Sequence, residues 1–226
     1  MPFTLNDVVP WGRSYEEYVR MFGLGDDELG SGILGCADGP ASFNAEATRR
    51  GTAVVSCDPL YQFDASAVRE RIQATAQDVL EQTRANMAAY VWTSIRSVEE
   101  LGAIRMAAMA QFLDDYERGL TEKRYLAAAL PRLAFADRAF DLAVCSHFLF
   151  LYSERFGAEF HVSAVRELCR VAEEVRIFPL LTLDGRRSPH IEPVVDDLAR
   201  AELLVSLETV PYEFQRGGSQ MMRIRR

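Results

Sequence analysis

Hydrophobic and polar positions follow two different periods along the chain, and the changes of period divide it into strands and helices. Short apolar runs at 32–36 and 53–57 are bounded by glycine, proline or acidic residues, which is typical of buried strands. The segment between these runs, 39–51, predicts a helix with Pro40 near its first turn and Gly51 as its stop. A strand, a helix and a strand in this order predict a parallel, right-handed βαβ unit.

A short capped helix is predicted ahead of this unit. Ser14 and Glu17 have the spacing of a capping box, and Gly23 follows as a stop signal. A second, brief helical turn is expected at 26–30. We therefore predict a helical N-terminal cap over residues 1–31.

Helical periodicity replaces the strand pattern in the middle of the chain. Apolar positions recur at helical spacing through 63–86 and again through 97–119, where Ser97 and Glu100 supply a second capping signal. Together these helices are longer than the usual connection between parallel strands. We interpret residues 62–122 as a helical insert between the second and third strands.

The alternation of strands and helices returns after residue 122. The predicted strands lie within 123–135, 140–152, 174–183, 202–214 and 219–226, and the predicted helices span 159–172 and 189–201. A Gly-Gly turn before the last run predicts an antiparallel closing hairpin. The expected fold class for the single domain 1–226 is α/β: a Rossmann-like, doubly wound, mostly parallel seven-stranded sheet with an antiparallel C-terminal hairpin.

The composition is that of a soluble, cytoplasmic globular protein. Of the 226 residues, 49% are hydrophobic, which is enough for one core, and no apolar run reaches the roughly 18 residues that a membrane helix needs. The beginning of the chain lacks the basic start and apolar stretch of a secretion signal. We expect no membrane partner.

Charge and cysteine placement argue against two other classes of protein. The formal net charge of −8 disfavours a nucleic-acid partner, since neutralising phosphates needs clustered Lys and Arg. The one basic cluster, at 223–226, is interpreted as the edge of a strand. The four cysteines lack C-x-x-C spacing, so we predict buried thiols in a reducing compartment and no metal site.

Small and acidic residues follow the predicted strands at the edge where open α/β sheets bind ligands. Gly35 begins a loop after the first strand, and a glycine allows close approach to the backbone. Asp58 follows the second strand, 58 − 35 = 23 residues later, close to the roughly 20 expected for an acid that binds a ribose. This spacing predicts a nucleoside-containing ligand.

The glycine loop distinguishes between nucleoside ligands. A dinucleotide fingerprint G-x-G-x-x-G would need glycine at three positions that hold Gly35, Ala37 and Pro40. Asp38 is also an unfavourable neighbour for a pyrophosphate. No G-K-[ST] follows the loop, which excludes a P-loop.

The loop matches G-x-G-x-G with alanine in the second place. With Asp58, the fourth strand and the closing hairpin, it resembles the class I S-adenosylmethionine-dependent methyltransferases, of an uncharacterised bacterial type, over residues 32–226. The resemblance implies S-adenosylmethionine as cofactor and S-adenosylhomocysteine as product. It implies that Gly35, Ala37 and Gly39 line the methionine part and that Cys36 and Asp38 of the same loop also bind the cofactor. It further implies contacts from Asp58 at the ribose, Pro59 and Leu60 at the adenine, and Ser146 and His147 at the sulfonium end.

The sequence departs from the family at Ile33, where members often have an acid. One hypothesis is that Asp38 holds the cofactor amine instead. Arg13 has two interpretations of equal weight, as a partner of the cofactor carboxylate or as a surface arginine. His147 is a candidate general base, although a structural, hydrogen-bonded histidine is the favoured interpretation. The catalytic residue is otherwise not identified by the sequence.

The leading hypothesis is methyl transfer to an unidentified acceptor, expected to be a small molecule. Two alternatives stay open: a non-catalytic protein that binds an adenosyl ligand, and, less favoured, an NAD-type oxidoreductase. The insert 62–122 and the N-terminal helix are expected to form a lid and an acceptor pocket. The long insert helices would equally suit a homodimer surface.

Overall fold

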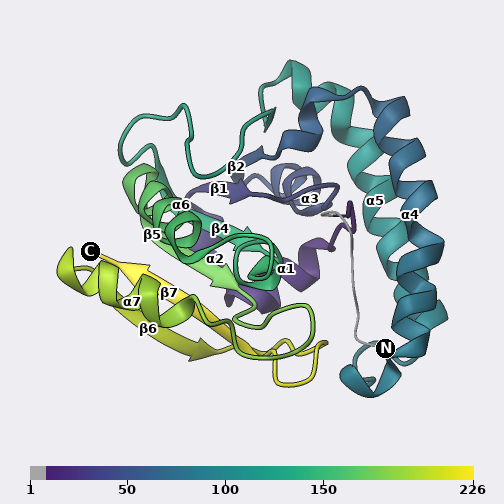
Figure 1. The fold of residues 1–226 in the computed structure, drawn as a ribbon. Helices are drawn as coiled ribbons and strands as arrows, with labels where there is room; N and C mark the ends of the chain where they lie inside the picture. The colour runs from purple at the N-terminus through teal and green to yellow at the C-terminus, as the bar shows by residue number, and fades with distance from the viewer. Residues whose placement is uncertain (1–8) are drawn as a thin grey trace.

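The structure, a computed structural model, describes residues 9–226, and the first eight residues of the predicted cap 1–31 lie outside that range. Within it, one sheet has the strand order β3-β2-β1-β4-β5-β7-β6 (Figure 1). The strands are β1 (Gly32–Cys36), β2 (Ala53–Cys57), β3 (Tyr125–Leu126), β4 (Phe140–Ser146), β5 (Ala172–Phe178), β6 (Leu204–Thr209) and β7 (Gln220–Arg225). Strands β1 to β5 pair in parallel, and β7 is antiparallel to both β5 and β6. The predicted fold class, including the antiparallel C-terminal strands, is confirmed.

Helices cover both faces of the sheet, as a doubly wound fold requires. They are α1 (Tyr15–Phe22), α2 (Asp26–Leu29), α3 (Phe43–Arg49), α4 (Ala65–Ala85), α5 (Val98–Thr121), α6 (Ala158–Val171) and α7 (Ile191–Arg200). Because successive residues of a strand point to opposite faces, neighbours in β1 serve different layers. Leu34 packs with α6 and α7, whereas Ile33 packs with α1 and α3.

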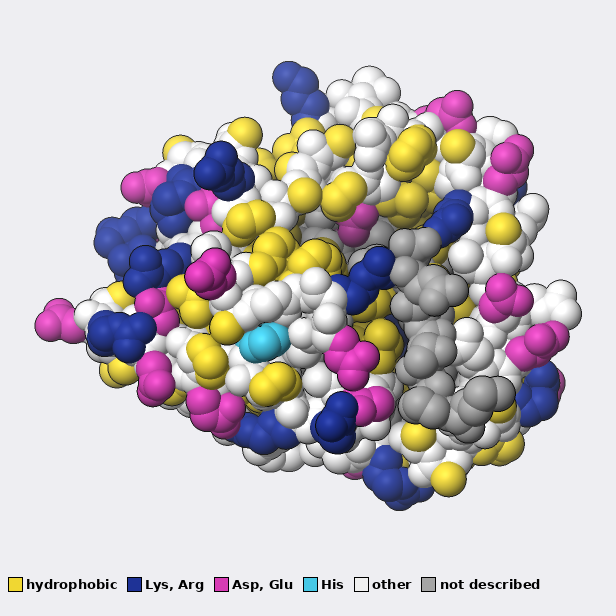
Figure 2. All heavy atoms as spheres, in the orientation of Figure 1, with side chains coloured by type: hydrophobic (Ala, Val, Ile, Leu, Met, Phe, Trp, Pro, Cys, Tyr) yellow, Lys and Arg dark blue, Asp and Glu magenta, His cyan; other side chains and the backbone are white. Residues whose placement is uncertain are grey.

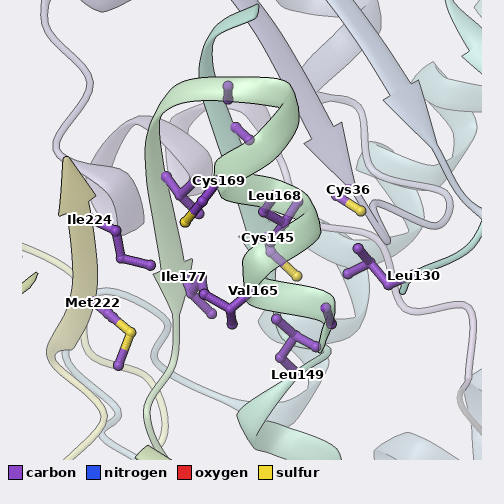
Figure 3. Packing of buried hydrophobic residues seen from close by; sticks show 14 of the residues in the cluster. Cys36, Leu130, Cys145, Leu149, Val165, Leu168, Cys169, Ile177, Met222 and Ile224 are labelled. Atoms are coloured by element: carbon purple, nitrogen blue, oxygen red, sulfur yellow. The ribbon is translucent and has the colours of Figure 1, made fainter. Parts of the chain in front are cut away.

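The α6 face shows how an amphipathic helix is fixed on the sheet. Val165 and Leu168 of α6 pack with Cys145 and Ile177 from the strands beneath them (Figure 3). Each of these four side chains is at most 1% exposed. All four cysteines of the chain are free and buried, in agreement with the sequence prediction.

The insert helices α4 and α5 lie side by side at the β3 edge of the sheet (Figure 1). Their buried residues, including Val79 and Phe112, form a separate cluster with Tyr125 of β3 and Trp11 from the chain before α1. The predicted insert between the second and third strands is therefore present. Helix α5 runs past Gly119, the predicted stop, as far as Thr121.

Several predicted boundaries are wrong. Helix α3 begins only at Phe43, later than the segment 39–51 predicted, because turns and bends precede it. The third strand has two residues only. Strand β4 ends at Ser146 because the following residue, His147, has a positive φ of 52°. Strand β5 ends at Phe178, since the proline after it has no N–H to donate to a ladder.

The prediction that the basic cluster 223–226 forms an edge is also wrong. Strand β7 lies between β5 and β6, and β6 is the edge strand. The charge of Arg223 is paired with Glu174, with Nε–Oε1 and Nη2–Oε2 distances of 2.8 and 2.9 Å. This arginine of an interior strand therefore already has a carboxylate partner.

Residues 9–226 contain neither a membrane-spanning helix nor a metal-binding cluster. No helix there combines the length and the apolar character needed to cross a bilayer. In the same part of the chain, no three or more His, Cys, Asp or Glu side chains gather in a way that would hold a metal ion.

Candidate functional site

A cavity of about 560 Å³ lies at the carboxyl ends of β1, β2 and β4. The connection after β1 leads to β2 and the connection after β4 leads to β5, in opposite directions along the sheet. The strand order therefore reverses between β1 and β4, and open α/β sheets bind ligands at such a position. Ten of the sequence-predicted residues line the cavity: Arg13, Cys36, Ala37, Asp38, Gly39, Asp58, Pro59, Leu60, Ser146 and His147. Gly35 is the one predicted residue that does not line it.

The loop after β1 owes its shape to two left-handed residues. Ala37 has φ of 57° and Gly39 has φ of 51°. A side chain in this region costs about 1–2 kcal/mol, so Ala37 is held in a strained conformation by its surroundings. A Cβ added to Gly39 would meet no atom within 4 Å, which leaves this backbone open to a ligand.

Gly35 is required for a different reason from the predicted one. A Cβ at Gly35 would lie 1.8 Å from Oδ2 of Asp38, because that carboxyl group folds back over the end of β1. The absent side chain makes room for Asp38 and not for a ligand. Direct contact between Gly35 and a cofactor is therefore not supported.

Asp38 is a buried carboxyl group held by hydroxyl donors. It accepts hydrogen bonds from Tyr18 Oη at 2.8 Å and from Ser56 Oγ at 2.6 Å, and it is 6% exposed. Burial, with the negative charge of Asp58 adding to it, raises the pKa of Asp38 to about 7, although both hydroxyl groups lower it. The group therefore changes its charge near neutral pH.

Asp58 is held by backbone donors on both of its oxygens. Oδ2 accepts from the N–H of Gly39 at 2.9 Å, and Oδ1 accepts from the N–H of Leu60 at 2.8 Å. The second bond caps the 3₁₀ turn Pro59–Gln62, so the end of β2 and the glycine loop are fixed to one carboxylate. A carboxylate has about four lone-pair sites, and two remain for ligand hydroxyl groups. Burial raises the pKa of Asp58 above its usual value.

Arg13 lies in the cavity wall, in the chain segment before α1. Its Nη1 donates to the carbonyl of Trp11 at 2.6 Å, and its buried Nε has no hydrogen-bond partner among residues 9–226. Burial and the neighbouring positive charge of Arg105 lower the pKa of Arg13. A half-buried guanidinium with an unused donor is a site for an anion, which favours the first of its two interpretations.

A buried network centred on Glu17 fixes this part of the wall. Glu17 accepts hydrogen bonds from Arg105 of α5, from Tyr212 Oη at 2.8 Å and from the N–H of Ser14 at 2.9 Å. Burial would raise the pKa of Glu17, but the charge and hydrogen bond of Arg105 outweigh it and lower the pKa to about 2. The network joins α1, α5 and the loop before β7.

Ser146 is the last residue of β4, and His147 follows it at the edge of the cavity. Ser146 Oγ and His147 Nδ1 are hydrogen-bonded at 2.9 Å, and the N–H of His147 donates to the carbonyl of Phe178 at 2.7 Å. Burial and the charges of Arg13 and Arg105 lower the pKa of His147 well below its usual value. The imidazole is neutral at physiological pH, and its backbone is fixed in the left-handed region.

Beyond this polar cradle, the cavity wall is apolar, and the sequence analysis missed most of it. The apolar and aromatic lining residues include Trp11, Phe63, Val79, Tyr90, Leu101, Leu130, Phe148, Leu151, Tyr152, Phe156, Phe160, Leu183 and Phe214. The aromatic residues between 148 and 160 were a usable signal, but Phe148 and Tyr152 were assigned to the predicted strand 140–152 and Phe160 to the predicted helix 159–172. Figure 2 shows hydrophobic side chains gathered over the middle and upper part of the face that it presents.

The packing of Asp38 against Gly35 gives a direct test of the loop. Gly35→Ala should lower the free energy of unfolding by about 1–3 kcal/mol, the usual cost of overpacking. In an Asp38→Ala background the same change should cost less than about 1 kcal/mol, because the three atoms nearest to the added Cβ all belong to Asp38. Urea denaturation of the four proteins measures the coupling, and equal costs in the two backgrounds would refute this packing.

The raised pKa of Asp38 predicts a dependence of stability on pH. The pKa rises from 3.8 to about 7 on folding, so the folded protein keeps a proton that the unfolded chain has already released. The stability from this group is complete below about pH 4 and is lost as the pH rises through about 7. Asp38→Asn should therefore gain stability relative to the wild type as the pH rises from 4 to 8. Denaturant melts at several pH values measure this, and a difference that stays constant with pH would contradict it.

One known protein is clearly related to this chain in sequence. No protein-family profile matches the chain. The uncharacterized protein MJ0045 of Methanocaldococcus jannaschii is 33% identical over 224 residues, which are 98% of this chain and 98% of that protein. That relative is archaeal, so the bacterial type in the sequence-based resemblance remains an expectation.

Similar solved structures include two methyltransferases. One is magnesium protoporphyrin IX methyltransferase from Synechocystis with bound SAM, at TM-score 0.48 and 11% identity, covering 94% of this chain and 91% of that chain. The other is a SAM-dependent methyltransferase from Aquifex aeolicus, at TM-score 0.44 and 15% identity, covering 93% of this chain and 87% of that chain. These similarities are too distant to assign an activity, which has to come from the site itself.

Proposed function

This chain belongs to the same family as the uncharacterized protein MJ0045 of Methanocaldococcus jannaschii, and from the geometry of its site we propose that it is an S-adenosylmethionine-dependent methyltransferase acting on a small molecule. One observation carries the proposal: Asp58 and Arg13 line the same cavity as the glycine loop. The first is an acid anchored for ribose hydroxyl groups, and the second is a half-buried cation whose Nε has no hydrogen-bond partner among residues 9–226. A ligand that joins a nucleoside to an amino acid needs an acceptor for its ribose hydroxyl groups and a cation for its carboxylate.

The remaining residues of the cradle fit the other parts of this cofactor. Pro59 and Leu60, beside the ribose acid, would border the adenine. The exposed backbone around Gly39 would approach the methionine part. Asp38 would hold the amine, since it lies in the same loop and ionises near neutral pH. This arrangement gives Asp38 the role that the acid missing at Ile33 has in the family.

The cofactor, when bound, would supply a methyl group already activated on a sulfonium. The protein then has to position the acceptor and exclude water, and such positioning can supply much of the rate acceleration. The apolar wall and the neutral His147 fit this task. We propose that the insert 62–122 and the N-terminal cap act as the lid over the acceptor pocket of this single domain, because Trp11, Phe63 and Tyr90 all line the cavity.

An NAD-type oxidoreductase is the less favoured alternative. The loop that would hold its pyrophosphate contains the buried carboxyl group of Asp38 and the side chain of Ala37. A non-catalytic adenosyl-binding protein would share the cradle, and it would be recognised by S-adenosylmethionine that binds but is never consumed.

The role of Arg13 tests the proposal with two related ligands. S-adenosylhomocysteine has the amino-acid carboxylate and amine, whereas 5′-methylthioadenosine lacks both. The wild type should bind S-adenosylhomocysteine at least tenfold more tightly. Arg13→Gln should reduce that preference by about tenfold or more and leave the affinity for 5′-methylthioadenosine unchanged, since a charged hydrogen bond contributes about 1.5–3 kcal/mol. Calorimetric titration measures all four affinities. A preference that is unchanged in Arg13→Gln would remove Arg13 from the cofactor site.

A further inference from the structure

Arg105 is a buried, charged residue of the cavity lining that the proposed cofactor does not use. Its side chain is 1% exposed, and its Nη1 donates to Glu17. Its Nε is buried and has no hydrogen-bond partner among residues 9–226. An unsatisfied buried donor on a charged group is costly, so the position is suited to a ligand that accepts a hydrogen bond.

The wall around Arg105 is apolar. Leu101 lies one helical turn before it on the same face of α5, and both residues line the cavity. Tyr90, Phe148 and Tyr152 continue this lining from other segments. A ligand in this part of the cavity meets a cation at one point and rings or aliphatic groups elsewhere.

Two arginines in this part of the cavity carry positive charge, and the single carboxylate of the cofactor can pair with only one of them. Arg13 and Arg105 line the cavity, whereas Glu17, the carboxylate that pairs with Arg105, is not among the lining residues. If Arg13 binds the cofactor carboxylate, Arg105 remains as a cavity-lining cation whose Nε has no hydrogen-bond partner among residues 9–226. A carboxylate satisfies both the charge and this donor and is ionised at neutral pH, unlike a phenol.

We infer that the methyl acceptor is an apolar carboxylic acid whose carboxylate docks at Arg105, an inference that rests on the proposed methyltransferase function. In the reaction, a carboxylate oxygen forms the new bond to the methyl carbon while the carbon–sulfur bond breaks and its electron pair stays on sulfur. The product is a methyl ester. No proton is released, so this step needs no general base.

A matched pair of probes tests this inference. The carboxylate 2-naphthoate and its neutral analogue 2-naphthamide have similar size and shape. They are titrated calorimetrically into protein saturated with S-adenosylhomocysteine. The wild type should bind 2-naphthoate at least tenfold more tightly than 2-naphthamide.

The variant Glu17→Gln/Arg105→Gln removes the charge without leaving Glu17 buried and unpaired. It should bind the two probes equally while keeping its affinity for S-adenosylhomocysteine within about threefold of the wild type. Arg105→Lys, which keeps the charge beside Glu17, should restore part of the preference even if the double variant folds poorly.

Four results would overturn the inference. Two concern the wild type: no preference for 2-naphthoate, or no binding of either probe. The other two concern the double variant: a preference for 2-naphthoate that survives, or a loss of S-adenosylhomocysteine affinity as large as that caused by Arg13→Gln. Failure of the wild type to bind S-adenosylhomocysteine would instead refute the proposed function, so the two failures are distinguishable.

Discussion

Glu17→Ala should lower the free energy of unfolding by about 3–5 kcal/mol, because it leaves the Arg105 guanidinium buried without its partner. The same change removes the acceptor of Tyr212 Oη and half of the Ser14 capping box. Urea denaturation at neutral pH measures the loss. The matched control is Glu16→Ala on the same helix. The exposed carboxylate of Glu16 lies 3.9 Å from Arg50, and its loss should change the free energy of unfolding by less than about 0.5 kcal/mol.

The effect of Glu17 should also depend on pH. Its folded pKa is lowered to about 2, so its contribution is complete above the unfolded value of about 4.5 and is lost as the pH falls through about 2. The difference between Glu17→Ala and the wild type should therefore shrink between those limits. A loss of stability no larger than that of Glu16→Ala would show that this network does not fix α1 to α5.

Asp58→Ala should weaken S-adenosylhomocysteine binding by about 5- to 150-fold, which corresponds to the 1–3 kcal/mol expected when charged hydrogen bonds are lost. The affinity for 5′-methylthioadenosine should fall by the same factor, because both ligands carry the ribose that Asp58 is proposed to bind. This equal loss distinguishes Asp58 from Arg13, whose effect is confined to the ligand with a carboxylate. Calorimetry on the two ligands measures it.

Asp64→Ala is the control for Asp58→Ala. Asp64 also caps a helical segment, accepting the N–H of Ala67 at 2.8 Å, but it is not among the residues that line the cavity. Its loss should cost about 1 kcal/mol of stability and leave the affinity unchanged. Unchanged affinity in Asp58→Ala would remove that residue from the site.

Features that are local in the sequence were predictable. The capping box of Ser14 and Glu17 and the βαβ unit around Gly35 depend on residues close together in the chain, and the structure has both. The closing antiparallel strands follow from two apolar runs and a turn. Asp58 was found because a parallel βαβ unit fixes the distance between two strand ends.

Features that depend on tertiary contacts were not predictable. Arg105 and Glu17 are 88 residues apart, and no periodicity connects them. The fold-back of Asp38 over Gly35 depends on the positive φ of Ala37, a residue type that rarely adopts it. The end of β4 was predicted wrongly because nothing in the sequence marks His147 as a residue with a left-handed backbone. The apolar wall comes from segments that only the fold brings together.

The central claim is that this cavity binds a methionine-linked nucleoside. The most direct test is calorimetric titration of the wild-type protein with S-adenosylhomocysteine, beside NADH and ATP as separate ligands. The proposed site predicts tight binding of S-adenosylhomocysteine and little or none of the other two, since the loop contains Asp38 where a phosphate would have to lie. No binding of S-adenosylhomocysteine, or a preference for NADH, would contradict the account.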